Sequence, residues 1–287
     1  MSEPELTPTL PLDTGDGSGL LVRDAIALLS AGELTVEGQV IDASNATFYC
    51  AVDDGVRQAA CVYKPVAGER PLWDFPGREL GRREVAAYEL SSLAGFHLVP
   101  YTAWVDGPYG EGSLQVWVDD DDTDVVLDLV PTGDVRDDDT TGLIRYDDRD
   151  WHRVLDGLDG ADRDVTLLHA DDPRLRTMAL FDAVINNADR KGGHILASQG
   201  RLFGVDHGIS FHPEPKLRTL LWGWAGQPFT DQEIARLRIV ADVVGEFEGL
   251  LGAEDTEALG TRVARLLARG VFPSPRGTRH VIPWPPW

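Results

Sequence analysis

Hydrophobic positions recur along the chain with two spacings, one typical of helices and the other of strands. Residues 20–34 and 75–95 carry apolar residues at helical spacing, and Gly95 provides an end for the second helix. Residues 36–66 and 99–118 are rich in β-branched and aromatic residues, and turn residues divide each stretch into two strands. Residues 20–118 are therefore predicted to form a small β-rich unit that includes a helix.

Helical spacing dominates the second half of the chain. Residues 171–190 begin with acids and with Pro173 in the first turn, and apolar residues lie nearly all round the helix, which predicts that it is buried. Residues 194–206 consist of two short apolar runs around a turn, which indicates a β-hairpin. Two amphipathic helices are expected over residues 230–252 and 255–270.

Polar segments flank and separate these two parts. Residues 1–19 combine Pro, Thr, Gly and acids with little to bury, which predicts disorder. The acidic run 119–124 is interpreted as a solvated connector, so that residues 119–287 form a second, mainly helical unit. The Pro- and Trp-rich residues 273–287 are predicted to be extended. The expected fold class is α+β.

The overall charge limits the classes of partner. The 287 residues carry a formal net charge of −22, which disfavours binding to nucleic acid and to anionic membrane surfaces. Two cysteines are too few for a secreted disulfide framework, so Cys50 and Cys61 are expected to be buried thiols on neighbouring strands. No apolar run is long enough for a membrane helix, and the N-terminus is acidic, so a soluble cytoplasmic protein is expected.

An acidic residue interrupts the apolar face of the helix predicted over residues 75–95. Glu84 shares this face with Leu80, Ala87 and Ala94. A carboxylate on a buried face requires a compensating partner, because an unpaired buried charge is costly. Glu84 is therefore predicted to meet a buried cation.

Three further charged residues occupy ends of predicted elements. Lys64 lies in a strand, Asp189 follows the buried helix, and Asp206 ends the hairpin. Together with Glu84, in this order along the chain, they resemble the protein-kinase-like fold. The segments "YKP", "NADR" and "VDHGISF" are most similar to its atypical branch, the phosphatidylinositol 3- and 4-kinases (including type II 4-kinases) and HipA-type kinases, and to a small group of uncharacterised actinobacterial proteins labelled as such kinases. The resemblance covers residues 36–212.

This resemblance implies a two-lobed fold, with a small β-rich N-lobe and a mainly helical C-lobe, that binds ATP and Mg²⁺ or Mn²⁺. Lys64 would hold the α- and β-phosphates and Glu84 would orient Lys64. Asp189 would receive the proton of an acceptor hydroxyl, Lys191 would neutralise the γ-phosphate, and Asp206 would bind the metal. The acceptor would be a lipid headgroup, a protein or a small molecule, and the charge favours the last two.

Three positions depart from the kinase pattern. His194 stands where the second metal ligand is normally Asn, so either His194 ligates, or Asn187 or a water replaces it, or the residue is structural. A Gly-rich phosphate loop is missing, and Ser44 and Asn45 either supply hydrogen-bond donors in its place or form a plain turn. His207 follows Asp206 where many kinases have an aromatic residue, and is interpreted as a core or capping histidine.

Two other functions are consistent with parts of this pattern. A nucleotide-binding pseudokinase would explain the departure at His194, but it has no need of Lys64, Asp189 and Asp206 together. A metal hydrolase would use the same aspartates with His194 and His207, but it leaves Lys64 without a role. An active kinase is therefore the leading hypothesis.

Overall fold

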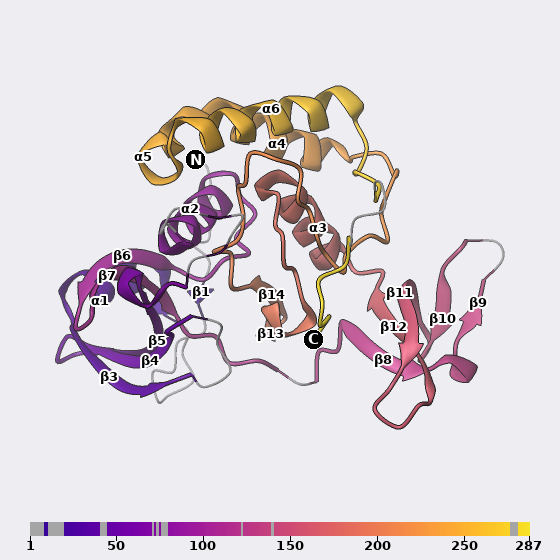
Figure 1. Ribbon diagram of the computed structural model, residues 1–287, viewed down its shortest axis with the longest axis horizontal. Coiled ribbons are helices and arrows are strands. Elements are labelled where there is room, and N and C mark those ends of the chain that lie inside the picture. Colours follow the sequence, from indigo (N-terminus) through magenta and orange to yellow (C-terminus); the bar gives the residue numbers. More distant parts are fainter. Residues whose placement is uncertain are drawn as a thin grey trace, which may run out of the picture.

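A computed structural model describes most of the chain, and its helices and strands form a mixed α+β protein built on antiparallel sheets. The described residues are 9–10, 20–40, 45–70, 72, 75, 80–121, 123–138, 141–275 and 281–287. Two sheets of five strands each lie at opposite ends of the molecule, with helices between and above them (Figure 1). The α+β class predicted from the sequence is confirmed.

The first sheet has the strand order β3-β4-β5-β7-β6. Its strands are β3 (Glu33–Gln39), β4 (Phe48–Asp53), β5 (Gln58–Pro65), β6 (Thr102–Gly107) and β7 (Gly110–Val116). Helix α1 (Val22–Ala31) covers one face, where its Leu28 packs in a cluster with Cys50 and Cys61. These two cysteines are directly opposite each other on β4 and β5, buried and not bonded to each other, as predicted.

Helix α2 (Leu80–Leu93) lies on the other face of this sheet. Its Gly81 approaches Ser113 of β7 closely, and Ser113 stands opposite Lys64 of β5, on the face turned away from the cysteines. After α2 the chain turns at Gly95, which has a φ of +68°, a backbone conformation that glycine adopts without strain.

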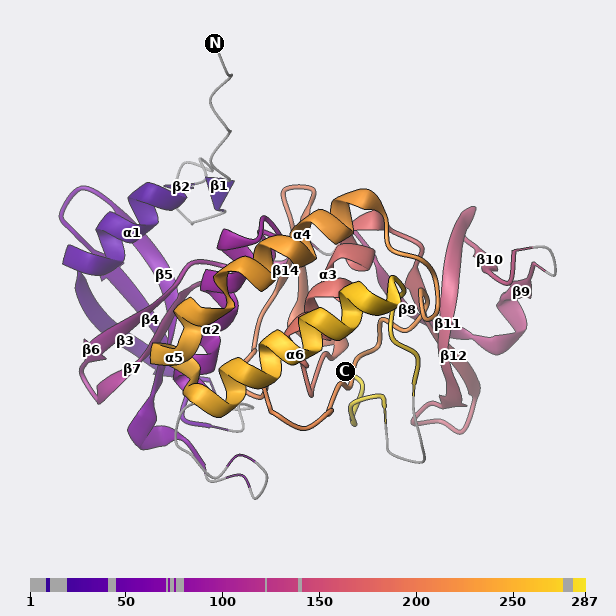
Figure 2. The ribbon, with the colours of Figure 1, turned by 90° about the horizontal axis from the view of Figure 1, so that it is seen from above.

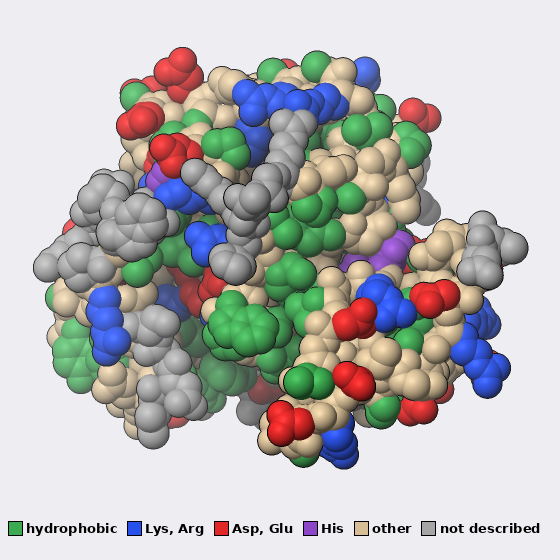
Figure 3. All heavy atoms as spheres, turned by 45° about the vertical axis from the view of Figure 1, so that its right-hand side comes forward, with side chains coloured by type: hydrophobic (Ala, Val, Ile, Leu, Met, Phe, Trp, Pro, Cys, Tyr) green, Lys and Arg blue, Asp and Glu red, His purple; other side chains and the backbone are tan. Residues whose placement is uncertain are grey.

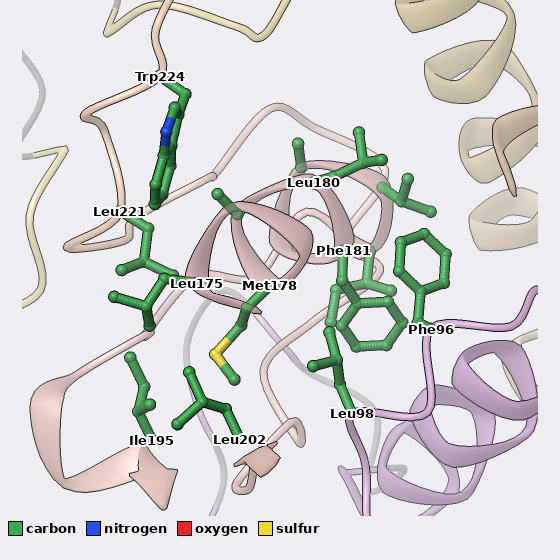
Figure 4. Packing of buried hydrophobic residues seen from close by; sticks show 14 of the residues in the cluster. Phe96, Leu98, Leu175, Met178, Leu180, Phe181, Ile195, Leu202, Leu221 and Trp224 are labelled. Carbon is green, nitrogen blue, oxygen red and sulfur yellow. The ribbon is translucent and has the colours of Figure 1, made fainter. Parts of the chain in front are cut away.

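Helix α3 (Pro173–Ile185) forms the centre of the main hydrophobic core. Asp172 caps its first turn by accepting from the Arg174 N–H, and the helix ends at Asn186 in the left-handed conformation. Figure 4 shows Phe96, which follows α2, and Leu202 packed beside α3. The buried helix predicted here is confirmed. Leu202 belongs to the equally predicted hairpin β13 (Ile195–Ser198) and β14 (Arg201–Gly204).

Helices α4 (Asp231–Val243) and α6 (Ala253–Arg269), joined through the short α5 (Glu248–Leu251), cross the top of the molecule (Figure 2). Thr230 and Glu233 form a capping box at the start of α4. Among the described helices, none combines the length and the apolar character needed to cross a membrane.

A second sheet occupies residues 127–170, a region without strands in the sequence interpretation. Its strands β8 (Leu127–Pro131), β9 (Arg136–Asp137), β10 (Ile144–Tyr146), β11 (Arg149–Leu158) and β12 (Asp164–Ala170) lie in the order β8-β12-β11-β10-β9. The expectation of a mainly helical part from residue 119 onward is therefore wrong for this region. The sequence of β11, RDWHRVLDGL, lacks the regular alternation of apolar and polar residues that marks a strand.

The polar segments differ in how well they were predicted. Of residues 1–19 the structure describes only Thr9–Leu10, which pair with Leu20–Leu21, and the predicted disorder of the others lies outside the described residues. The acidic run is more than a solvated connector, because Asp120 accepts from the Ala197 N–H and Asp124 forms an ion pair with Arg174.

Candidate active site

Lys64 and Glu84 form an ion pair between the first sheet and α2. The side chains of β5 alternate, so Lys64 projects from the face opposite the buried Tyr63. Its Nζ lies 2.6 Å from Oε1 of Glu84, whose side chain is 4% exposed. The cationic partner predicted for Glu84 is thus Lys64, whose side chain is 23% exposed and so only partly buried. The second carboxylate oxygen of Glu84 accepts the backbone N–H of His207 at 2.8 Å, which ties α2 to the segment after β14.

Asp206 connects this pair to the other half of the molecule. It follows β14 with a φ of +60°, a conformation that Asp and Asn tolerate better than most residues. Its Oδ1 lies 2.9 Å from Lys64 Nζ, and its Oδ2 lies 3.4 Å from Nε2 of His194. Lys64 therefore contacts one acid from α2 and another from the β14 end.

The charges in this cluster shift each other's pKa values. Burial by itself lowers the pKa of Lys64, but the negative charges of Asp206 and Glu84 outweigh burial and raise it above its ordinary value. The positive charge of Lys64 in turn lowers the pKa of Asp206 well below the usual range for a carboxyl group. At neutral pH the cluster therefore holds a cationic Lys64 between two carboxylates.

The loop after α3 brings Asp189 and Lys191 to the same cluster through His194. Oδ2 of Asp189 lies 3.1 Å from Nζ of Lys191. Nδ1 of His194 donates to the backbone carbonyl of Asp189 at 2.9 Å, while its other ring nitrogen faces Asp206. The result is one continuous polar chain. Its members in order are Glu84, Lys64, Asp206, His194, Asp189 and Lys191.

The orientation of His194 defines which ring nitrogen is free. A carbonyl oxygen only accepts, so Nδ1 carries the proton, and in a neutral imidazole Nε2 then has a lone pair. Burial lowers the pKa of His194 despite the opposing charge of Asp206, which favours the neutral ring. The lone pair of Nε2 and a carboxylate oxygen therefore face each other at 3.4 Å without a proton between them. Such an arrangement attracts a cation.

A buried ion pair that the sequence interpretation missed holds this loop in place. The side chains of Arg190 and Asp182 are both fully buried, with Nη2 and Oδ1 3.0 Å apart. Arg190 also donates to the carbonyl of His194 and to Nε2 of His207. Asp182 interrupts the apolar helix α3 just as Glu84 interrupts α2, so the same reasoning from its sequence would have identified it.

The remaining predicted site residues have other contacts. Asn187 is fully buried and bonds to Asp182 and to the N–H of Asp189, so it is not available as the alternative metal ligand. Asn45 accepts from the Arg70 N–H, and no described contact joins it to Lys64. Ser44 lies outside the described residues. His207 is buried and bonded to Arg190, which confirms its interpretation as a core histidine.

Two other features bear on the location of a site. Within the described part of the chain, no three His, Cys, Asp or Glu side chains converge as a complete metal cage, so Asp206 and His194 form a pair of candidate ligands only. A surface pocket of about 500 Å³ lies on the second sheet, lined by Thr132, Asp156 and Asp164 among others. It contains no residue of the polar chain.

The fold and the site together define a mixed α+β protein in which a partly buried lysine paired with a buried glutamate, two aspartates and a histidine form one cluster. The chain is 48% identical over 276 residues to protein Rv2133c of Mycobacterium tuberculosis, a match that covers 94% of this chain and 98% of that protein. The chain belongs to the same family as protein Rv2133c. No family model matches the sequence.

Proposed function

We propose that the chain is an ATP-dependent kinase with the two-lobed arrangement of the protein-kinase-like fold. The observation that carries the proposal is the contact of Lys64 with both Glu84 and Asp206, which are 20 and 142 positions away in the sequence. A kinase needs these three residue types together, because a lysine binds the phosphates, a glutamate orients it and an aspartate binds the metal. The first sheet with α1 and α2 would be the N-lobe.

The donor set suits a cation that is shared with phosphate. Asp206 and His194 offer one carboxylate and one lone pair of a neutral imidazole, and Mg²⁺ commonly takes one or two protein ligands and completes its shell with phosphate oxygens and water. The carboxylate of Asp206 also suits Mn²⁺, so both ions are candidates. A cation bound there would neutralise charge on the transferred phosphoryl group. Lys64 would exchange its contact with Asp206 for one with the phosphates and keep its contact with Glu84.

Asp189 and Lys191 are the residues that would act on the transferred group. The carboxylate of Asp189 would take the proton of an acceptor hydroxyl while the hydroxyl oxygen bonds to the γ-phosphorus and the bond from that phosphorus to the β–γ bridging oxygen breaks. ADP then leaves with the bridging oxygen. Lys191 contributes positive charge beside the γ-phosphoryl oxygens.

The charge of the molecule favours a soluble acceptor. A formal net charge of −22 repels the anionic headgroups at a membrane surface, whereas the local cations Lys64 and Lys191 still attract the phosphates of ATP. A protein hydroxyl or a small polyhydroxy molecule is therefore the proposed acceptor class, in preference to a phosphoinositide headgroup.

The metal role is tested with two matched substitutions. Asp206→Asn keeps a residue that tolerates the positive φ but removes the charge, and Asp162→Asn makes the same change at an exposed position with a φ of +58°. We expect the thermal shift produced by ATP with Mg²⁺ or Mn²⁺ to disappear in Asp206→Asn and to persist in Asp162→Asn. An equal metal-dependent shift in both variants would refute the assignment of Asp206.

Catalysis is tested separately from binding. ATP turnover and transfer of labelled γ-phosphate are measured against soluble proteins, small hydroxyl compounds and phosphoinositide vesicles, in wild type and in Asp189→Ala. Loss of a general base typically costs about 10²–10⁴-fold in rate, so Asp189→Ala should fall into that range. Unaltered turnover would remove Asp189 from the mechanism. ATP binding without any turnover in wild type would instead indicate the pseudokinase that the departure at His194 suggests.

A further inference from the structure

The C-terminal segment 281–287 returns to the candidate active site. The carbonyl oxygen of Val281 accepts the backbone N–H of Thr219 and the indole N–H of Trp222, both at 3.1 Å. The carbonyl oxygen of Pro286 accepts the N–H of Gly192 at 2.9 Å. In Figure 1 the chain accordingly ends in the middle of the molecule, near β13.

The ring of Trp287 lies directly against Gly192. A Cβ atom at Gly192 would come within 2.7 Å of Cε3 and 2.9 Å of Cδ2 of this ring, closer than real Cβ contacts. At the neighbouring Gly193 an added Cβ would meet nothing within 4 Å, and neither glycine has a positive φ. The absence of a side chain at Gly192 therefore leaves room for the Trp287 ring. The backbone conformation at this position does not require glycine.

The loop that carries Lys191 is held from two sides. On one side Arg190 donates its N–H to the carbonyl of Arg218 and accepts the N–H of Leu220. On the other side Gly192 is held by the C-terminal segment. Lys191 lies between these two anchors, and its Nζ contacts the carboxylate of Asp189. The anchors thus fix the backbone on either side of the proposed phosphate-binding lysine.

Trp287 makes this contact without being part of the hydrophobic core. The residue Trp287 is 59% exposed, and Trp284 is 81% exposed. Hydrophobic side chains are also exposed near the middle of the face that Figure 3 shows. Large exposed aromatic residues add little to the stability of a fold, so the burial of apolar surface does not account for the placement of Trp287.

We propose that Trp287 is a positioning residue of the candidate active site. Its ring and the Pro286 carbonyl clamp Gly192, and the clamp sets Lys191 and Asp189 against the pair formed by Lys64 and Asp206. The inference rests on the proposed phosphoryl transfer. It makes the Trp287 ring and the Pro286 carbonyl part of the transfer site, although Trp287 is 95 residues beyond Gly192, as the difference 287 − 192 gives.

The test compares two substitutions with two matched controls. Trp287→Ala removes the ring and Gly192→Ala pushes it away, while Trp284→Ala and Gly193→Ala make the same chemical changes where no such contact exists. A displacement of about 1 Å in a catalytic group costs up to about 100-fold in rate. We expect Trp287→Ala and Gly192→Ala to lower kcat for ATP turnover by about tenfold or more, with KM for ATP changed less than about twofold because Lys64 is untouched.

The double variant Trp287→Ala with Gly192→Ala separates the clamp from a general loss of folding. If both changes act through the ring, Gly192→Ala has no further effect once the ring is absent, so the double variant matches Trp287→Ala alone. Trp287→Phe, which keeps an aromatic ring, should restore most of the rate. Additive losses in the double variant, or loss of kcat in the controls, would overturn the proposal.

Amide hydrogen exchange of Gly192 tests the clamp independently of any turnover. We expect faster exchange in Trp287→Ala and wild-type protection in Trp284→Ala, because only the first loosens the bond to Pro286. Faster exchange with unchanged kcat, or a raised KM with unchanged kcat, would overturn the positioning role. If wild type turns over no ATP, the proposed function fails, and the exchange experiment still decides whether Trp287 holds the loop.

Discussion

The buried pair of Arg190 and Asp182 offers the sharpest test of how the candidate loop is held. Arg190→Met keeps most of the side-chain volume but removes the charge and the donors. Among the described residues, the Asp182 side chain would keep as partners only the Asn187 amide, at 3.0 Å, and the Thr219 hydroxyl, at 3.1 Å. A buried charge that loses its partner costs about 3–5 kcal/mol, and both side chains are fully buried here, so we expect a loss in that range.

The assay is urea unfolding followed by circular dichroism, with thermal unfolding as a second measurement. Such a loss corresponds to a fall in Tm of at least about 5 °C for a chain of 287 residues. Arg145→Met is the control, because the ion pair of Arg145 with Asp150 is half-exposed and contributes at most about 1 kcal/mol.

A second variant identifies the cause. Adding Asp182→Asn to Arg190→Met replaces the uncompensated carboxylate with a neutral amide, and we expect about 2 kcal/mol to be recovered. Equal losses in Arg190→Met and Arg145→Met, or no recovery in the double variant, would refute the reasoning. Either result would mean that the burial of this pair does not determine the stability of the loop.

Three further predictions concern other parts of the molecule. Glu84 accepts from Lys64 Nζ and from the His207 N–H, and in Glu84→Gln the side-chain amide N–H₂ would face one of these two donors. Because two donors cannot bond to each other, we expect ATP affinity, measured by thermal shift, to fall about tenfold. Burial lowers the pKa of His169 to about 3, so below pH 6.5 the unfolded state binds more protons than the folded state. The free energy of unfolding should therefore decrease as the pH is lowered, by about 1 kcal/mol between pH 6 and pH 5. His169→Gln should flatten this dependence. Burial raises the pKa of Cys50 to about 11 and of Cys61 to about 12, so neither should react with a thiol reagent at pH 8 until urea unfolds the chain.

Much of the local structure could be predicted because it depends on short-range periodicity. Pro173 and the apolar residues around it were enough to predict α3, and Gly95 marked the end of α2. The second sheet was not predicted, because its strands lack such a short-range periodic pattern. Half of the residues of β11 and β9 are both exposed and charged, and their pairing, which no local pattern encodes, makes them strands.

The candidate site was predicted in part. Glu84 required a cation because an acid on an apolar helix face cannot be left unpaired, and the structure supplies Lys64. Arg190 gave no such signal, since an arginine in a polar loop is usually solvated. The alternative role for Asn187 was excluded only when its amide was found bonded to Asp182.

Outside the second sheet, the sequence alone determined the main helices and strands, their order and the residue types at their ends, because helix and strand periodicity and the cost of a buried charge act over a few neighbouring residues. Only the tertiary structure decided which of these ends meet. It joins Lys64 to Asp206 across 142 positions, turns the free nitrogen of His194 toward Asp206, and brings Trp287 back to Gly192. The physical reason is that such contacts depend on how the sheet, the helices and the C-terminal segment pack together, and no periodicity in the chain records that packing.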